Sequence, residues 1–178
     1  MQPVQNESLY NKLVRGDTHA LEETIGDEDA SARTEIADAF AEACFRGDSK
    51  ILELLLSFNC SPNFINRNGQ SPLHVAAESL KEIFVSKLLN SGANPNLKDN
   101  YGQTPLFIAI DAEVELAKYV ADQEGKPSEA EIIVSKLLLD AGADPFIATF
   151  QDVSPYQLAL EIQHKKIIEL IERRYKIS

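Results

Sequence analysis

Apolar residues gather in short runs that recur along the chain, and polar residues and a glycine close each pair of runs. One run contains Ala76 and Ala77, the next contains Leu88 and Leu89, and Gly92 follows them. Such a pair predicts two consecutive helices, because glycine accepts the left-handed conformation in which helices often end. The small alanine pair lets the second helix approach the first closely. The predicted unit is therefore a helix–turn–helix pair.

A four-residue motif marks the start of each unit. Residues 71–74 are Ser-Pro-Leu-His, residues 104–107 are Thr-Pro-Leu-Phe, and residues 154–157 are Ser-Pro-Tyr-Gln. Serine or threonine before proline is typical of a helix start, where the hydroxyl caps and the missing N–H of proline has no cost. Recurrence of such a motif indicates one supersecondary unit stacked on copies of itself.

Asn68-Gly69 and Tyr101-Gly102 predict tight turns at the tips of short extended fingers. With these turns the unit is finger, helix, turn, helix and loop, and the chain resembles the ankyrin-repeat family. The family unit runs G-x-T-P-L-H-x-A-A, a turn, an apolar helix and G-A-D/N-x-N, and the resemblance covers roughly residues 34–174. It implies an all-α ankyrin-repeat solenoid of about five helical hairpins with short β-turn fingers.

We expect residues 1–178 to form a single ankyrin-repeat domain. Its predicted segments are a degenerate N-terminal capping hairpin at 7–33, repeats at 34–65, 66–98 and 99–147, and a C-terminal capping repeat at 148–178. The charged residues interleaved in the last segment suit a cap, because the ends of a solenoid must remain soluble.

The third repeat carries an insertion. Its motif proline and closing glycine are 37 residues apart, against 20 in the second repeat, which places 17 extra residues near 112–129. The inserted sequence is helix-prone, and Ser128 with Glu131 has the capping-box spacing. We therefore expect both helices of this repeat to gain about two turns, roughly 12 Å. The resulting prong either contacts a partner or is a neutral insertion, since surface insertions have a small energetic cost.

Charge and composition exclude several classes of function. The net charge of −11 argues against a nucleic-acid partner, because neutralising phosphates requires clustered Lys and Arg. Acidic residues concentrate between 22 and 42, either as a solvated surface or as an attraction for a basic partner. The chain has no apolar run that could span a bilayer and no signal-peptide pattern. We expect a monomeric, cytoplasmic protein with no membrane partner; a periplasmic or secreted protein is the alternative if a signal was removed.

The residues capable of chemistry form no recognised catalytic or metal-binding motif. Cys44 and Cys60 fall where the repeat has small buried residues, which favours two packed thiols over a disulfide. His74 belongs to the repeat motif, where its imidazole is expected to hold neighbouring backbone. The sequence contains no Cys-x-x-Cys, His-Glu-x-x-His, phosphate-binding loop or Gly-x-Ser-x-Gly. We therefore expect no enzyme, no cofactor and no metal.

The resemblance implies protein binding through the finger tips and the exposed side of the first helices, which together form a concave face. The candidate partner-binding residues are Phe45, Arg46, Arg67, Asn68, Gln70, Glu78, Ser79, Asn100, Tyr101, Gln103, Asp111, Phe150 and Gln151, with Tyr119 on the insertion. Tyr101 and Phe150 carry the most weight, because aromatic residues are enriched in hot spots; packing against the adjacent finger is the alternative. The finger of Phe150 has Asp152 in place of the repeat's glycine, so we expect it to bend differently.

We expect the protein to act by stoichiometric protein–protein interaction. One hypothesis is an inhibitor or protective, immunity-type antagonist of a basic enzyme such as a hydrolase. A second is a generic scaffold or adaptor, or a secreted bacterial effector, that recognises a folded partner. The third, an enzyme of unrecognised type, has no motif in its favour.

Overall fold

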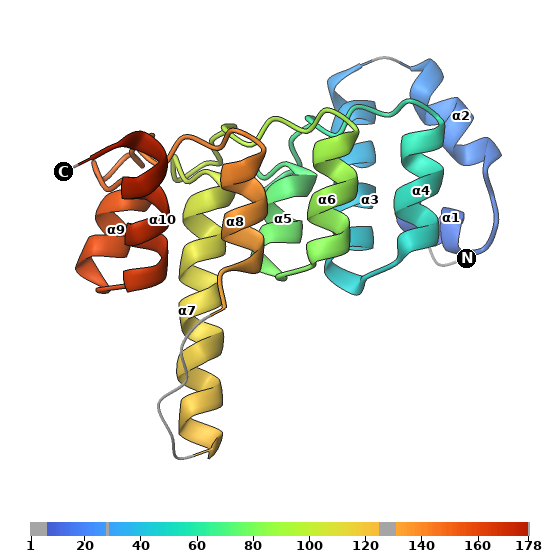
Figure 1. Ribbon diagram of the computed structural model, residues 1–178. Helices are drawn as coiled ribbons and strands as arrows, with labels where there is room; N and C mark the ends of the chain where they lie inside the picture. Colours follow the sequence, from blue (N-terminus) through green and yellow to red (C-terminus); the bar gives the residue numbers. More distant parts are fainter. Residues whose placement is uncertain (1–6, 28, 125–130, 178) are drawn as a thin grey trace.

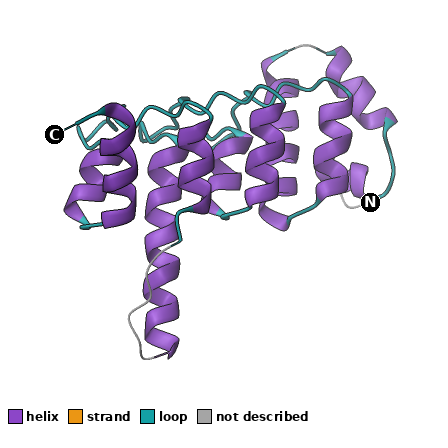
Figure 2. Cartoon of the chain, viewed as in Figure 1, coloured by secondary structure: helices purple, strands orange, loops and turns teal. Residues whose placement is uncertain are grey.

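The computed structural model describes residues 7–27, 29–124 and 131–177, and this part of the chain forms ten helices and no strands (Figures 1 and 2). The helices are α1 (Leu9–Val14), α2 (His19–Gly26), α3 (Ala30–Arg46), α4 (Ser49–Ser57), α5 (Pro72–Glu78), α6 (Glu82–Asn90), α7 (Pro105–Glu124), α8 (Ile133–Asp140), α9 (Pro155–Glu161) and α10 (Lys165–Tyr175). They follow one another as hairpins, which confirms the expected all-α solenoid.

The hairpins stack in two layers. The first helices α3, α5, α7 and α9 lie side by side in one layer, and the second helices α4, α6 and α8 form the other (Figure 1). Large apolar side chains from both layers are fully buried between them, among them Phe40, Leu52, Leu73, Leu106 and Leu138. Burying each contributes about 1.5–3 kcal/mol. Since each hairpin buries its apolar side against the next, the stack is stable only as an array.

The proline motif fixes where three of the first helices begin. Helices α5, α7 and α9 all start at the motif proline, directly after serine or threonine. At α9, the Ser154 hydroxyl accepts the Gln157 N–H (3.2 Å), and the Gln157 side-chain oxygen accepts the Ser154 N–H (2.8 Å). This reciprocal capping box satisfies N–H groups that have no partner within the helix.

His74 takes the place of that glutamine at α5 and also joins two repeats. Its Nδ1 accepts the Ser71 N–H (3.1 Å), so its proton lies on Nε2, which donates to the Gln103 carbonyl of the next repeat (3.1 Å). Burial lowers the pKa of His74, although the hydrogen bond to Gln103 opposes this. The imidazole is therefore neutral and structural, as the motif predicted.

The N-terminal part departs from the repeat pattern. Helix α3 is continuous from Ala30 to Arg46, so it begins four residues before the predicted boundary at 34 and has no finger in front of it. The Asp29 carboxylate accepts the Ala32 N–H (2.7 Å) and caps this helix. Helices α1 and α2 both pack against α3 and cover this end of the stack.

Helix α7 is much longer than its neighbours. It has 20 residues, against 7 in α5 and 7 in α9. The additional 13 residues, 112–124, are called the prong; they extend beyond the stack, away from the interhairpin loops (Figures 1 and 2), by roughly 20 Å. The expectation that both helices gain about two turns is wrong, because α8 has only 8 residues and begins at Ile133. The predicted cap Ser128 lies outside the described residues.

Glu113, near the base of the prong, explains where α8 begins. Its side chain is 4% exposed, and its Oε1 accepts the N–H groups of Val134 (2.8 Å) and Ser135 (3.1 Å). Its Oε2 accepts the Ser135 hydroxyl (2.5 Å). A carboxylate at this end of a helix pairs with free N–H groups and faces the positive end of the helix dipole. One side chain of α7 therefore caps α8 and fixes the prong against it.

Candidate protein-binding face

Three fingers project from the loops between hairpins: finger 1 (residues 66–70), finger 2 (99–103) and finger 3 (149–153). In each, the N–H of the first residue donates to the carbonyl of the fifth, over 2.9, 2.9 and 3.0 Å. The fourth residue has positive φ in all three: 75° at Gly69, 77° at Gly102 and 59° at Asp152. Asp152 thus adopts the conformation of the glycines, which short polar side chains tolerate. The expected different bend of finger 3 is wrong.

Fingers 1 and 2 each carry a glycine at the tip, which lets the next finger stack closely against them. A Cβ atom on Gly69 would lie 2.2 Å from the Asn100 side chain, and one on Gly102 would lie 2.7 Å from the Phe150 backbone nitrogen. The Phe150 N–H donates to the Tyr101 carbonyl (3.2 Å), which joins fingers 2 and 3. The candidate residues on the fingers are therefore held at fixed spacing.

The Phe45 groove lies between α3, finger 1 and α5 and has a volume of about 600 Å³. It is lined by Asp38, Ala41, Glu42, Phe45, Asn66, Asn68, Gln70, Val75, Glu78, Ser79 and Lys81. The predicted residues placed here are Phe45, Asn68, Gln70, Glu78 and Ser79. The structure therefore brings residues of two successive units together around one hollow.

The Tyr101 groove lies between finger 2, α5 and α7 and has a volume of about 390 Å³. It is lined by Gln70, Glu78, Asp99, Tyr101, Gln103, Phe107, Ile108, Asp111 and Ala112. Gln70 and Glu78 line both grooves, and the Gln70 amide lies 3.5 Å from the Glu78 carboxylate. The two grooves thus form one continuous concave surface that crosses two repeats.

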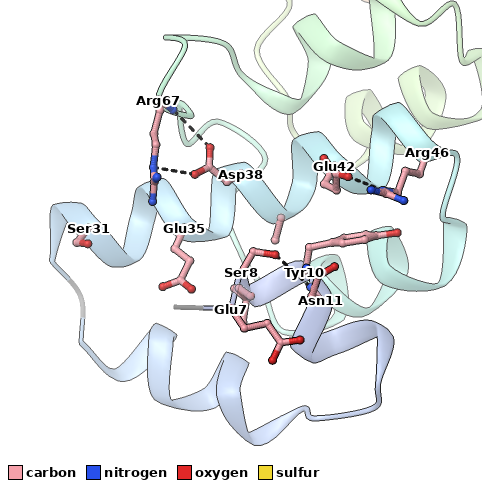
Figure 3. A pocket seen from close by; sticks show the side chains of 12 residues that line it. Glu7, Ser8, Tyr10, Asn11, Ser31, Glu35, Asp38, Glu42, Arg46 and Arg67 are labelled. Carbon is pink, nitrogen blue, oxygen red and sulfur yellow. Dashed lines mark hydrogen bonds and ion pairs between the residues drawn. The ribbon is translucent and has the colours of Figure 1, made fainter. Parts of the chain in front are cut away.

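A third hollow, the N-terminal pocket, lies between α1 and α3 and has a volume of about 560 Å³ (Figure 3). It receives the predicted residues Arg46 and Arg67. Arg67 pairs with Asp38 (3.1 Å), while Arg46 pairs with Glu42 and lies 5.6 Å from the centre of the Tyr10 ring. Both guanidinium groups are therefore held by carboxylates of the same chain, as the dashed lines in Figure 3 show.

The remaining predicted residues line none of these three hollows. Asn100 covers Gly69 on the neighbouring finger, and Gln151 lies exposed on finger 3. Phe150 packs against Gly102 but stays largely exposed, with the Lys98 ammonium 5.8 Å from its ring centre. Phe150 is therefore exposed at the finger tip and also packs against the adjacent finger, so each of the two interpretations describes part of its surroundings.

Tyr101 and Tyr119, the two predicted tyrosines, are 72% and 64% exposed. Tyr101 stands on finger 2 at one end of the Tyr101 groove. Tyr119 lies on the prong, beyond the residues that line the groove. Two apolar rings thus face solvent at separate places along the same repeat.

Acidic residues dominate the lining of the three hollows. The carboxylates are Glu7, Glu35, Asp38, Glu42, Glu78, Asp99 and Asp111, and the cations are Arg46, Arg67 and Lys81. Among the residues that the structure describes, Glu35, Glu78 and Asp111 form no ion pair. A concave surface with this excess of carboxylates has a negative potential and favours positively charged groups.

Several lining residues were missed from the sequence. Asp38, Ala41 and Glu42 precede Phe45 by seven, four and three residues on α3, so they share its face. Stepping back from Phe45 at helical spacing would have identified them. Phe107 ends the motif that starts α7 and Ile108 follows it, and neither was among the predicted binding residues.

The described part of the chain contains no metal cluster, and its two cysteines are buried. No cluster of three or more His, Cys, Asp or Glu side chains there could hold a metal ion. Cys44 and Cys60 are buried free thiols, and burial raises their pKa values to about 12 and about 11. Within the described ranges, every helix is too short or too polar to cross a membrane.

Comparison with protein families gives a match over this region. A family model described as ankyrin repeats (3 copies) matches residues 40–132, just over half of the 178 residues. The matched segment includes fingers 1 and 2, helices α4, α5 and α6, and α7 with its prong. It therefore contains most of the surface that lines the Phe45 and Tyr101 grooves.

Proposed function

Because the chain belongs to the ankyrin-repeat family, whose repeats are protein–protein interaction modules, we propose that it binds a basic protein partner stoichiometrically on the concave face. We further propose that binding inhibits this partner, as an immunity-type antagonist inhibits an enzyme such as a hydrolase. The observation that carries the proposal is the continuous surface of the Phe45 and Tyr101 grooves, which is hollow, acidic and bordered by exposed aromatic rings.

The aromatic rings supply the contact energy in this proposal. Phe45 and Tyr101 stand at the Phe45 and Tyr101 grooves respectively, and both are exposed. Truncating an aromatic side chain that is buried at the centre of an interface often costs about 2 kcal/mol or more of binding free energy. Since hydrogen bonds fix the backbone at Tyr101, little backbone entropy is lost when a partner covers it.

The carboxylates supply selection of the partner. Glu78 lies where the two grooves meet, and Asp111 lines the second groove. Complementary charge increases association rates more than it increases affinity. An enzyme that acts on anionic substrates carries a basic rim around its active site, so an acidic concave surface that covers this rim also blocks substrate entry. This is why inhibition, rather than tethering, is the proposed outcome of binding.

The test is affinity capture from extracts of the native host, followed by assays on the purified captured protein. Glu78→Lys should weaken the complex. Glu169→Lys is the control, because Glu169 is exposed on α10, and it should leave the complex unchanged. Tyr101→Ala should cost about 1 kcal/mol or more of binding energy while leaving the melting temperature unchanged. An equimolar amount of this protein should also abolish the partner's catalytic activity.

The possible outcomes separate the proposals. Capture that is insensitive to both Glu78→Lys and Tyr101→Ala would place the binding surface away from the concave face. Capture that depends on these residues, without any loss of partner activity, would exclude inhibition and support the adaptor hypothesis.

A further inference from the structure

Residues of α7 extend the surface of the Tyr101 groove along the prong. Ala112 lines the Tyr101 groove, and Leu116 and Tyr119 follow it by four and seven residues on the same helix. Side chains at this spacing share one face of a helix. Leu116 is 51% exposed and Tyr119 is 64% exposed. Together with Ile108 these residues form the α7 strip, which leads from the groove to the prong over about 16 Å.

One edge of the α7 strip is acidic. Asp111, Glu115 and Asp122 are exposed and follow one another at intervals of four and seven residues, which aligns them along the helix. Lys118 lies in the same row, between Glu115 and Asp122, and pairs with Glu115 (2.7 Å), so the row holds three carboxylates and one ammonium. The strip therefore combines an apolar centre with a negative margin on one side.

We propose that the α7 strip binds a helix of the partner protein, apolar on one face and carrying a row of Lys or Arg residues along one edge of that face. The inference rests on the proposed function, because it assigns a second contact to the partner held in the Tyr101 groove. An amphipathic helix is the occupant because a straight apolar strip along one helix is matched by the apolar stripe of another. The basic edge follows from charge complementarity with Asp111, Glu115 and Asp122.

Two features of the structure support this assignment. The base of the prong is fixed, since the buried Glu113 carboxylate bonds to the start of α8, so Leu116 is presented at a defined angle to the groove. A second copy of this chain would bring an identical acidic edge against the first, and like charges disfavour such a contact.

The probe for this strip is a stapled helical peptide of about 20 residues, long enough to span roughly 30 Å. Leucines occupy one face at spacings of four and seven residues, and arginines occupy one edge. A second peptide carries glutamate in place of every arginine. Fluorescence anisotropy should show saturable binding of the arginine peptide alone, and the affinity should fall when NaCl rises from about 0.05 to 0.3 M.

The double variant Leu116→Arg/Tyr119→Arg should weaken binding of the arginine peptide at least about tenfold. Both side chains are exposed and arginine is a good helix former, so the fold should persist, which circular dichroism checks. Val14→Arg is the matched control, because Val14 is 55% exposed on α1, far from α7 along the stack. It should leave the affinity unchanged.

Equal binding of the two peptides, or unchanged binding by the double variant, would overturn the inference. A dimer in sedimentation velocity that the double variant abolishes would overturn it too, in favour of self-association. Suppose that Glu78→Lys weakens partner capture but the double variant binds the peptide as well as the wild-type protein does. This result would reject the α7 strip and leave the concave-face function intact. Capture that is insensitive to Glu78→Lys and Tyr101→Ala would instead reject the concave-face function.

Discussion

Replacing Glu113 should show how strongly one buried carboxylate holds the third repeat together. Glu113→Ala leaves the N–H groups of Val134 and Ser135 and the Ser135 hydroxyl without their acceptor. Hydrogen bonds to a charged group contribute about 1.5–3 kcal/mol each when counted singly, and losing a helix cap typically costs about 1 kcal/mol. These values overlap, because the same N–H groups are counted in both. We expect the free energy of unfolding to fall by about 2–4 kcal/mol.

The pH dependence of Glu113 gives a second, independent signature. Burial raises its pKa above the ordinary value, and the hydrogen bonds from Ser135 and Val134 oppose this only in part. A carboxyl whose pKa is raised on folding stabilises the fold fully below its unfolded pKa, and this stability is lost as pH rises through the folded pKa. Glu113→Gln removes the titration but keeps an acceptor oxygen. It should therefore be less destabilising at pH 7.5 than at pH 4.5, relative to the wild-type protein.

Urea unfolding followed by circular dichroism measures these differences. Glu115→Ala is the control, since Glu115 lies two residues away, is exposed and pairs with Lys118; an exposed pair of this kind contributes about 0.3–0.5 kcal/mol. If Glu113→Ala cost no more than Glu115→Ala, the carboxylate could not be what determines the start of α8.

Three further predictions concern the repeat framework. Gly102→Ala should lower the free energy of unfolding by about 2 kcal/mol or more, because it adds a clash with the next finger to the cost of positive φ; Gly142→Ala, with nothing within 4 Å of the new Cβ, should show only the backbone cost of about 1 kcal/mol in the same urea titration. Lowering the pH from 7.5 to 5.5 should destabilise the wild-type protein more than His74→Phe, because the depressed pKa of His74 means that stability is lost as pH falls through the unfolded value of about 6.5. Cys44 should react with a thiol reagent at the rate of unfolding, since burial raises its pKa to about 12; rapid reaction of the native protein at pH 8 would contradict this.

The fold could be predicted because its signals are local and repeated. Each proline motif contains its own cap, and each closing glycine its own turn, so the helix starts at Pro72, Pro105 and Pro155 followed from a few residues each. The insertion was visible as extra length, but its division between two helices was not. That division depends on Glu113, which bonds to residues more than twenty positions later.

The candidate site was predictable to a similar degree and for the same reason. Residues on the fingers and at the ends of first helices were found because turn geometry places them. Asp38 and Glu42 were missed, since α3 lacks the proline that marks other first helices and extends further back than the repeat period indicates. The ion pair between Arg67 and Asp38 could not be predicted either, because only the folded stack brings finger 1 beside α3.

The contact between Glu113 and the start of α8 has a consequence for measurement. The Val134 and Ser135 amides can exchange with deuterium only when this contact opens. Their exchange rates therefore report how often the lever formed by residues 112–124 comes loose from the body of the protein. A ligand that binds residues 112–124 and holds this contact closed would slow exchange at both amides without touching either of them.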